Sequence, residues 1–166
     1  NIEGITNLNG NYILSNRGNK GFLKNYMIVL PENFWLHQDS CVIYTLLAGV
    51  NKDTAAFNGI SGLEYDFASD KLLATVSTEN TYSNNADGEI GKSYLWLFYD
   101  MQEKKNYRAV NPDIIIDLGK SDNRFTGHKI EAVTILSRSR KQMDLLFVAD
   151  DDDGYTHLFK ARLIFN

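Results

Sequence analysis

With 166 residues, of which 43% are hydrophobic and 23% charged, the chain is long enough for one globular domain with a substantial apolar core. Its formal net charge of -4 at pH 7 argues against a nucleic-acid partner, because binding phosphates requires a basic surface. The single cysteine, Cys41, excludes an internal disulfide framework, and no apolar run approaches the roughly 18 residues of a membrane-spanning helix.

Short apolar segments rich in Ile, Val, Leu, Tyr and Phe alternate with clusters of Asn, Gly, Asp and Ser, which is typical of consecutive antiparallel strands. No segment has the periodicity of an amphipathic helix. The Asn-Gly pair at 9–10 tolerates positive φ and predicts a tight hairpin between the first two strands. In chain order, the strands are predicted at residues 2–8, 11–15, 25–30, 42–50, 60–67, 71–77, 93–100, 114–118, 129–136, 143–149 and 157–165.

One short pattern occurs three times: Ile, a polar residue, a small residue, a β-branched residue or Leu, and a polar residue. It reads IEGIT at 2–6, ISGLEY at 60–65 and IEAVT at 130–134. Each copy leads to a turn, a second strand ending in a polar cluster and a third strand, and the first two copies lead to a fourth. Repeated four-stranded units of this kind predict β-propeller blades, with boundaries at about 1–57, 58–120 and 121–166.

Two four-stranded blades and one three-stranded blade are fewer than the roughly four to eight with which propellers close. The sequence therefore predicts an all-β chain that is part of a larger six- or seven-bladed ring. The remaining blades would precede Asn1 in the same protein or come from another chain, because blade faces left open would expose apolar surface. The alternative is a self-contained β-sandwich of about eleven strands.

Polar residues at equivalent repeat positions are expected to converge, because the innermost strand of each blade lines the central channel. Glu3 and Glu131 share one position, Ser61 takes that position in the second unit, and Glu64 follows three residues later. Three carboxylates at one channel mouth would attract a cation such as calcium, or supply an acid and a base. The alternative is that each Glu accepts backbone N–H groups where a strand begins.

The polar clusters after the second strands are also equivalent and fall at the same end of each unit. Arg17, followed by Gly18, can hold a carboxylate or phosphate with two hydrogen bonds, or pair with a neighbouring acid at the surface. His128 precedes the third innermost strand and is placed to face the channel mouth, although the three histidines show no metal-ligand spacing. The equivalent clusters are Asn16, Arg17 and Asn19; Glu79 and Asn80; and Asp150 and Asp151.

The acidic run at 150–154 does not follow the EF-hand pattern, which would put Ala149 and Lys160 at its two ends. It predicts either an acidic turn or an oxygen-rich calcium site of another kind at Asp150 and Asp151.

Three segments resemble blades of the phytase-like and esterase-like β-propeller group. They are NIEGITNLNGNYILSNRGN at 1–19, ISGLEYDFASDKLLATVSTEN at 60–80 and KIEAVTILSRSRKQMDLLFVADDDDG at 129–154. The likeness is greatest to bacterial members without known activity that carry an N-R-G-N segment like the one at 16–19. By analogy, the resemblance implies a periplasmic or secreted protein.

Phytases of this fold hold calcium with carboxylates and phosphate with Lys and Arg. The resemblance therefore implies calcium-assisted hydrolysis of a phosphoester or ester at the channel mouth. A complete phytase site is not matched, and the alternative is a non-catalytic propeller that binds a small ligand or a protein partner. The residues available for the implied roles are Glu3, Arg17, Glu64, Glu131 and the Asp150 region.

Overall fold

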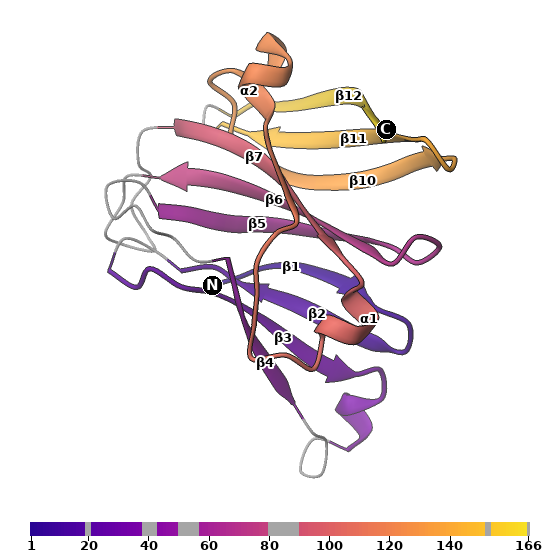
Figure 1. Cartoon of the computed structure of the whole chain (residues 1–166). Helices are drawn as coiled ribbons and strands as arrows, with labels where there is room; N and C mark the ends of the chain where they lie inside the picture. Colours follow the sequence, from indigo (N-terminus) through magenta and orange to yellow (C-terminus); the bar gives the residue numbers. More distant parts are fainter. Residues whose placement is uncertain (19–20, 38–42, 50–56, 80–89, 152–153, 166) are drawn as a thin grey trace.

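The structure is a computed structural model of the chain, and it describes residues 1–18, 21–37, 43–49, 57–79, 90–151 and 154–165. In these residues the secondary structure is mostly β, and the strands form three sheets that pack one upon another (Figure 1). The prediction of a β-rich chain is confirmed. Three packed sheets differ from the two layers of the alternative β-sandwich.

The first sheet has five strands in the order β1-β2-β3-β4-β8. Neighbours from β1 to β4 are antiparallel, whereas β8 pairs with β4 in parallel and was not predicted. The predicted strand at 42–50 corresponds to β4, and Cys41, Val42 and Val50 lie outside the described residues. The strands of this sheet are β1 (Ile2–Asn7), β2 (Asn11–Asn16), β3 (Asn25–Pro31), β4 (Tyr44–Ala48) and β8 (Ala109–Val110).

The other two sheets are antiparallel throughout, and each begins with a long hairpin. The second sheet has four strands in the order β5-β6-β7-β9, and the third has three in the order β10-β11-β12. The strands of the second sheet are β5 (Phe57–Asp66), β6 (Lys71–Glu79), β7 (Ile90–Tyr99) and β9 (Ile114–Asp117). Those of the third are β10 (Ile130–Arg138), β11 (Gln142–Asp150) and β12 (Thr156–Ile164).

The described helical segments are single turns between strands, and none is long and apolar enough to cross a membrane. Asp117 starts one of them by accepting a hydrogen bond from the backbone N–H of Lys120 at 3.0 Å, as an N-cap does. The segments are η1 (Phe34–Leu36), α1 (Met101–Lys104), α2 (Leu118–Ser121) and η2 (Asn123–Phe125).

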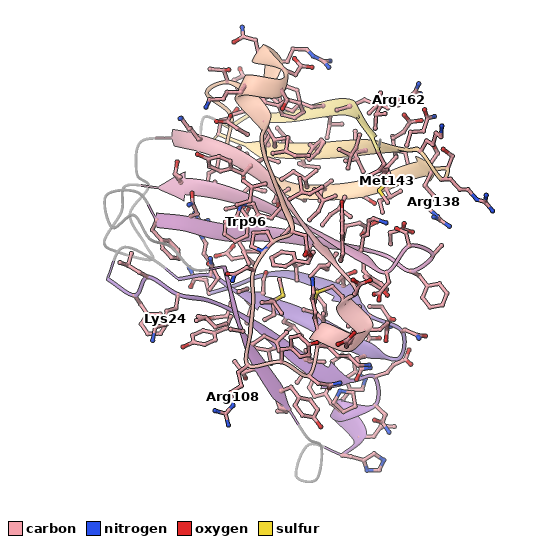
Figure 2. All side chains as sticks on the ribbon, in the orientation of Figure 1. Lys24, Trp96, Arg108, Arg138, Met143 and Arg162 are labelled. Atoms are coloured by element: carbon pink, nitrogen blue, oxygen red, sulfur yellow. The ribbon has the colours of Figure 1, made fainter. Side chains whose placement is uncertain are left out.

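The middle sheet is buried on both faces, because successive side chains of a strand point to opposite sides. Leu72 and Val76 of β6 pack in a core shared with the first sheet, which also holds Trp96. Leu73, between them in sequence, packs in a second core shared with the third sheet, which also holds Met143 (Figure 2). This two-sided burial explains why these strands are apolar runs without alternation.

The outer sheets alternate, because each of them packs on a core with one face only. In β12 every second side chain is exposed, including Leu158 at 64% and Ile164 at 66%. At the opposite end of the stack, Ile2 and Ile5 of β1 are each 54% exposed. Apolar side chains therefore face outward at both ends of the stack.

Two equivalent side chains fasten each sheet to the first strand of the next. Asn25 of β3 accepts a hydrogen bond from the backbone N–H of Ile60, and Ser93 of β7 accepts one from Ile130, both at 3.2 Å. Each side chain also donates to the carbonyl two residues before that partner, at 2.8 Å. The contact between the first and second sheets is thus repeated between the second and third.

Candidate functional site

The first strand of every sheet contains a β-bulge at the same repeat position. The pairing of these strands shifts between Ile2 and Gly4, between Ile60 and Gly62, and between Ile130 and Ala132. A bulge changes the direction of a side chain and is common beside active sites. The bulged residues are Glu3, Ser61 and Glu131, the set identified from the sequence repeat.

The glycine after each of the first two bulges lets the next sheet approach closely. A Cβ atom on Gly4 would lie 2.9 Å from the backbone nitrogen of Leu63, and one on Gly62 would lie 2.6 Å from the carbonyl oxygen of Glu131. The sequence pattern of a polar residue followed by a small one therefore has a physical meaning. The first residue is turned by the bulge, and the second fits under the neighbouring strand.

Four charged side chains gather where β2 ends and where β1 and β10 begin; we call Glu3, Arg17, Lys129 and Glu131 the charged cluster. The ammonium group of Lys129 lies 3.1 Å from Oε1 of Glu131. Burial raises the pKa of Glu131, against the attraction of Lys129 and Arg17, and the negative charge of Glu3 adds to the rise. Three residues predicted as a site from the sequence are thus close enough to act on one another.

Arg17 reaches from the end of β2 onto the second sheet. Its Nη2 donates to the hydroxyl of Ser77 at 3.2 Å. Its side chain fills the space beside Gly59, where a Cβ atom would lie 2.3 Å from the arginine Nε. Gly59 therefore leaves room for the guanidinium group, a role that the sequence analysis did not identify. The arginine is held between two sheets and is not a loose surface side chain.

Glu64 and Ser61, which holds the repeat position of Glu3 and Glu131, connect the second sheet to the third. Oε1 of Glu64 accepts hydrogen bonds from the Thr134 hydroxyl at 3.1 Å and from the backbone N–H of Ile135 at 3.2 Å. The buried hydroxyl of Ser61 donates to the carbonyl of Ile130 at 2.7 Å. In both cases β5 is joined to β10. Glu64 thus links two strands through the middle of β10, and not at the start of a strand.

The remaining members of the equivalent polar clusters are described only in part. Glu79 ends β6, but its side chain lies outside the described residues, as do Asn19 and Asn80. Asp150 is exposed at the end of β11, and its backbone N–H donates to the carbonyl of Lys129 at 3.1 Å.

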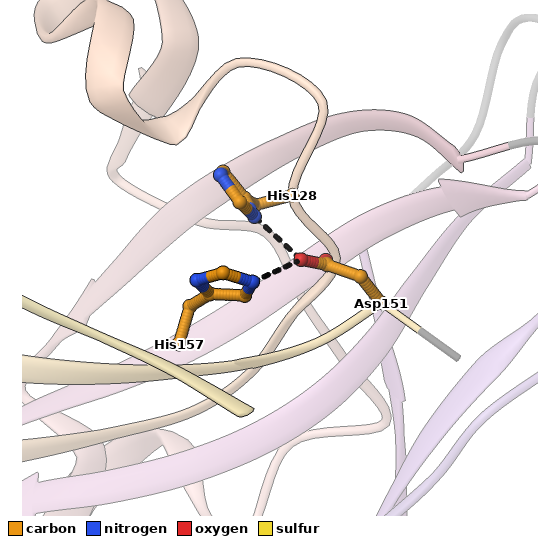
Figure 3. Close-up of side chains that lie close together, drawn as sticks. All are labelled: His128, Asp151 and His157. Carbon is orange, nitrogen blue, oxygen red and sulfur yellow. Dashed lines mark hydrogen bonds and ion pairs between the residues drawn. The ribbon is translucent and has the colours of Figure 1, made fainter. Parts of the chain in front are cut away.

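Two histidines and an aspartate form a second group, the imidazole cluster, made of His128, Asp151 and His157 (Figure 3). Oδ2 of Asp151 lies 2.5 Å from Nδ1 of His128 and 3.6 Å from Nε2 of His157. Its other oxygen accepts the backbone N–H of Lys129 at 2.8 Å. Burial opposes the charge of Asp151, but the hydrogen bonds from Lys129 and His128 leave its pKa below the ordinary value.

The sequence analysis named His128 and Asp151 but not His157. The strand pairing supplies the missing relation, because His157 pairs with Ala149 at the end of the β11–β12 hairpin. This pairing brings it next to Asp151, while His128 enters from the segment that leads into β10. Spacing along the sequence therefore does not show which of these residues come together.

A surface hollow of about 340 Å³ lies between the α2–η2 segment and the third sheet. Leu118, Phe125 and Phe147 form part of its apolar wall, and Arg124 and Arg162 stand at its polar side. None of the residues predicted as a site lines it, so the two polar clusters are the stronger candidates for chemistry.

Replacing Glu131 with Gln should raise the melting temperature at pH 7 by about 2–4 °C. The pKa of Glu131 in the folded protein lies above the ordinary value of 4.5. Between the two pKa values the folded state binds more protons than the unfolded state, so stability falls as the pH rises through this range. Gln does not titrate, so the difference should shrink below this range. Thermal unfolding of both proteins across pH 3–8 measures this, and a lower melting temperature for Glu131→Gln at pH 7 would contradict it.

The comparisons with known proteins identify a family without an assigned activity. No curated protein and no solved structure matches the chain. A family of unknown function, DUF6929, matches residues 1–163 of the 166. The chain therefore belongs to the DUF6929 family.

Proposed function

We propose that the three sheets are β-propeller blades and that the charged cluster binds a small ligand carrying a carboxylate or phosphate group. The blade interpretation is supported by three features. The strand order runs outward from β1, β5 and β10, the bulges repeat, and Asn25 and Ser93 make equivalent contacts between successive sheets. A ring of six or seven such blades would cover the apolar end faces. Imaging of the full-length protein by electron microscopy tests the ring.

The observation that carries the ligand proposal is the position of Arg17. Its guanidinium group is anchored to Ser77, and both Arg17 and Lys129 lie close enough to Glu131 to lower its pKa. A guanidinium group binds carboxylate and phosphate in planar, two-bonded geometry, and an ammonium group adds a point charge. Glu3 and Glu131 balance these charges in the free protein and would accept hydrogen bonds from hydroxyl or amine groups of the ligand.

Replacing Arg17 with Ala should weaken the binding of phenyl phosphate or benzoate by about tenfold or more, since a charge-assisted bond is worth about 1.5–3 kcal/mol. Ligand-detected NMR titration with the full chain measures the affinity. Arg162→Ala is the matched control, because Arg162 pairs with Asp144 at 2.7 Å on the third sheet and lies outside the charged cluster. Equal affinities for the two variants would contradict the proposal.

Hydrolysis of a phosphoester or ester at the same place is the second candidate function, in line with the phytase-like resemblance. The raised pKa of Glu131 favours it, since a carboxyl group that holds its proton more tightly than usual is better suited to act as an acid and then as a base. Turnover of p-nitrophenyl phosphate or acetate that disappears in Glu131→Gln would support it. Binding without turnover would leave a non-catalytic ligand-binding protein.

Calcium stays a prediction in this proposal. Of the two aspartates predicted as its ligands, Asp150 is exposed, and Asp151 has both carboxylate oxygens engaged with Lys129, His128 and His157. Addition of calcium to the hydrolysis assay and to a thermal melt tests it directly.

A further inference from the structure

We propose that the imidazole cluster is a binding site for a divalent ion of the zinc class, separate from the ligand site at the charged cluster. The donor atoms of the cluster favour such an ion. Two imidazole nitrogens and one carboxylate oxygen are the donor set that zinc and the neighbouring transition ions prefer, whereas calcium takes oxygen donors almost exclusively. Nothing in the charged cluster offers a nitrogen donor of this kind.

The spacing of the donor atoms fits a single small ion. The three donor atoms all lie within 4.8 Å of one another. In a tetrahedral zinc site with bonds of about 2.0–2.1 Å, donor atoms stand about 3.4 Å apart. The separation between His157 and Asp151 is 3.6 Å, close to that value. The 2.5 Å separation between His128 and Asp151 is a hydrogen-bond distance, and it must lengthen by about 1 Å as the ion takes the place of the shared proton.

The site is held by contacts outside the three donors. Asp151 is oriented by the backbone N–H of Lys129, which binds the oxygen that does not face the histidines. The carbonyl of His128 accepts the Ser93 hydroxyl at 2.8 Å, so its backbone is fixed to the second sheet. The ring of Phe159 lies 4.9 Å from the His128 ring and 6.4 Å from the His157 ring. Such outer contacts fix ligand orientation in metal sites.

The accessibility of the cluster suits an ion that keeps an open position. Asp151 is 9% exposed, His128 is 25% exposed and His157 is 43% exposed, so solvent reaches the group from the side of His157. Three protein donors leave one position of a tetrahedral ion for water or another ligand, as in catalytic zinc sites. A closed structural site would instead need a fourth side chain.

The test is metal binding by the full chain, measured without any substrate. Co²⁺ is added first, because its visible spectrum reports nitrogen and oxygen ligation in four-coordinate geometry, and Zn²⁺ affinity is then measured by competition. We expect one equivalent of Co²⁺ to give an intense visible band that Zn²⁺ removes, and Zn²⁺ to raise the melting temperature by mass action. Ca²⁺ and Mg²⁺ should do neither.

Three variants locate the ion. His157→Asn and Asp151→Asn should weaken Zn²⁺ binding by about 100-fold or more, since loss of a ligand exceeds the effect of losing an outer contact. His157 is partly exposed, so its replacement should leave the metal-free melting temperature nearly unchanged. His37→Asn is the matched control, because His37 follows η1 and is not part of the cluster.

Two results would overturn the site. One is a featureless Co²⁺ spectrum together with no Zn²⁺-dependent shift, which would leave the cluster as a hydrogen-bonded group that holds the β11–β12 hairpin. The other is Zn²⁺ binding that survives in His157→Asn but is lost in His37→Asn. Neither result depends on Arg17 or on phosphate binding, so this proposal and the proposed function can fail separately.

Discussion

Replacing Asn25 with Ala should lower the free energy of unfolding by about 3–5 kcal/mol. The side chain is fully buried between the first and second sheets. Its Oδ1 accepts from the backbone N–H groups of Gly18 at 3.3 Å and Ile60 at 3.2 Å, and its Nδ2 donates to the carbonyl of Asn58 at 2.8 Å. Ala would leave two N–H groups and one carbonyl without a partner in a place that water does not reach, at about 1–3 kcal/mol each before relaxation.

Equivalent residues of the other sheets provide matched variants for this measurement by urea unfolding. Ser93→Ala removes two inter-sheet hydrogen bonds, whereas Asn25→Ala removes two inter-sheet bonds and a third to Gly18 beside its own sheet, so the effect of Ser93→Ala should be smaller. Thr156 holds the same repeat position in β12 but is exposed, and Thr156→Ala should change stability by less than about 0.5 kcal/mol. Equal effects for Asn25→Ala and Thr156→Ala would refute the role assigned to Asn25.

Replacing Gly62 with Ala should cost about 2–3 kcal/mol, although Ala is normally the better residue outside turns. The added Cβ would lie 2.6 Å from the carbonyl oxygen of Glu131 and 2.8 Å from the hydroxyl of Thr75. Because the first of these atoms is backbone, β10 must move away from β5. The movement would also displace Glu131, so ligand binding at the charged cluster should weaken in the same variant.

Gly119→Ala is the control for the added methyl group. Gly119 lies in α2, and its Cβ would meet nothing closer than the Thr126 hydroxyl at 3.3 Å. Ala favours a helix over Gly by about 1 kcal/mol, so this variant should be neutral or slightly more stable. The same urea unfolding experiment compares both, and a Gly62→Ala protein as stable as Gly119→Ala would show that the sheets are not in tight contact there.

The strands could be predicted because their signal is local. Alternation in β11 and continuous apolar runs in β6 follow directly from whether one face or both faces are buried. The strand β8 could not be predicted in this way, since its two residues, Ala109 and Val110, pair with β4, far away in the chain. A pair of residues carries no period, and its partner is determined only by the tertiary fold.

The charged cluster was predictable in part because the repeat relates distant positions. The repeat predicted that Glu3 and Glu131 are equivalent, and the same bulge surrounds both. It did not predict that Glu64 accepts bonds from Thr134 and Ile135, because which face of β10 lies opposite β5 depends on how the sheets pack. Lys129 was missed because it precedes the repeated pattern, and the residues at the same place in the other two copies, Asn1 and Gly59, are uncharged.

The imidazole cluster could not be found from the spacing of its residues along the sequence. His128 and His157 are far apart in sequence, and only the hairpin pairing of Ala149 with His157 brings the second ring to Asp151. A search for ligands at helix or loop spacing cannot find such a group. A search over residues at the same end of neighbouring antiparallel strands would have reached it, because Asp151 follows β11 and His157 lies near the start of β12.

One residue of the charged cluster, Lys129, also contacts the imidazole cluster. The backbone N–H of Lys129 holds Asp151, while its ammonium group lies beside Glu131. A change that moves the backbone of Lys129 beside Asp151 would therefore also move its ammonium group beside Glu131. Occupancy of either cluster should therefore alter affinity at the other, and linkage requires the two effects to be equal in free energy. On this view the two clusters are separate sites that Lys129 connects.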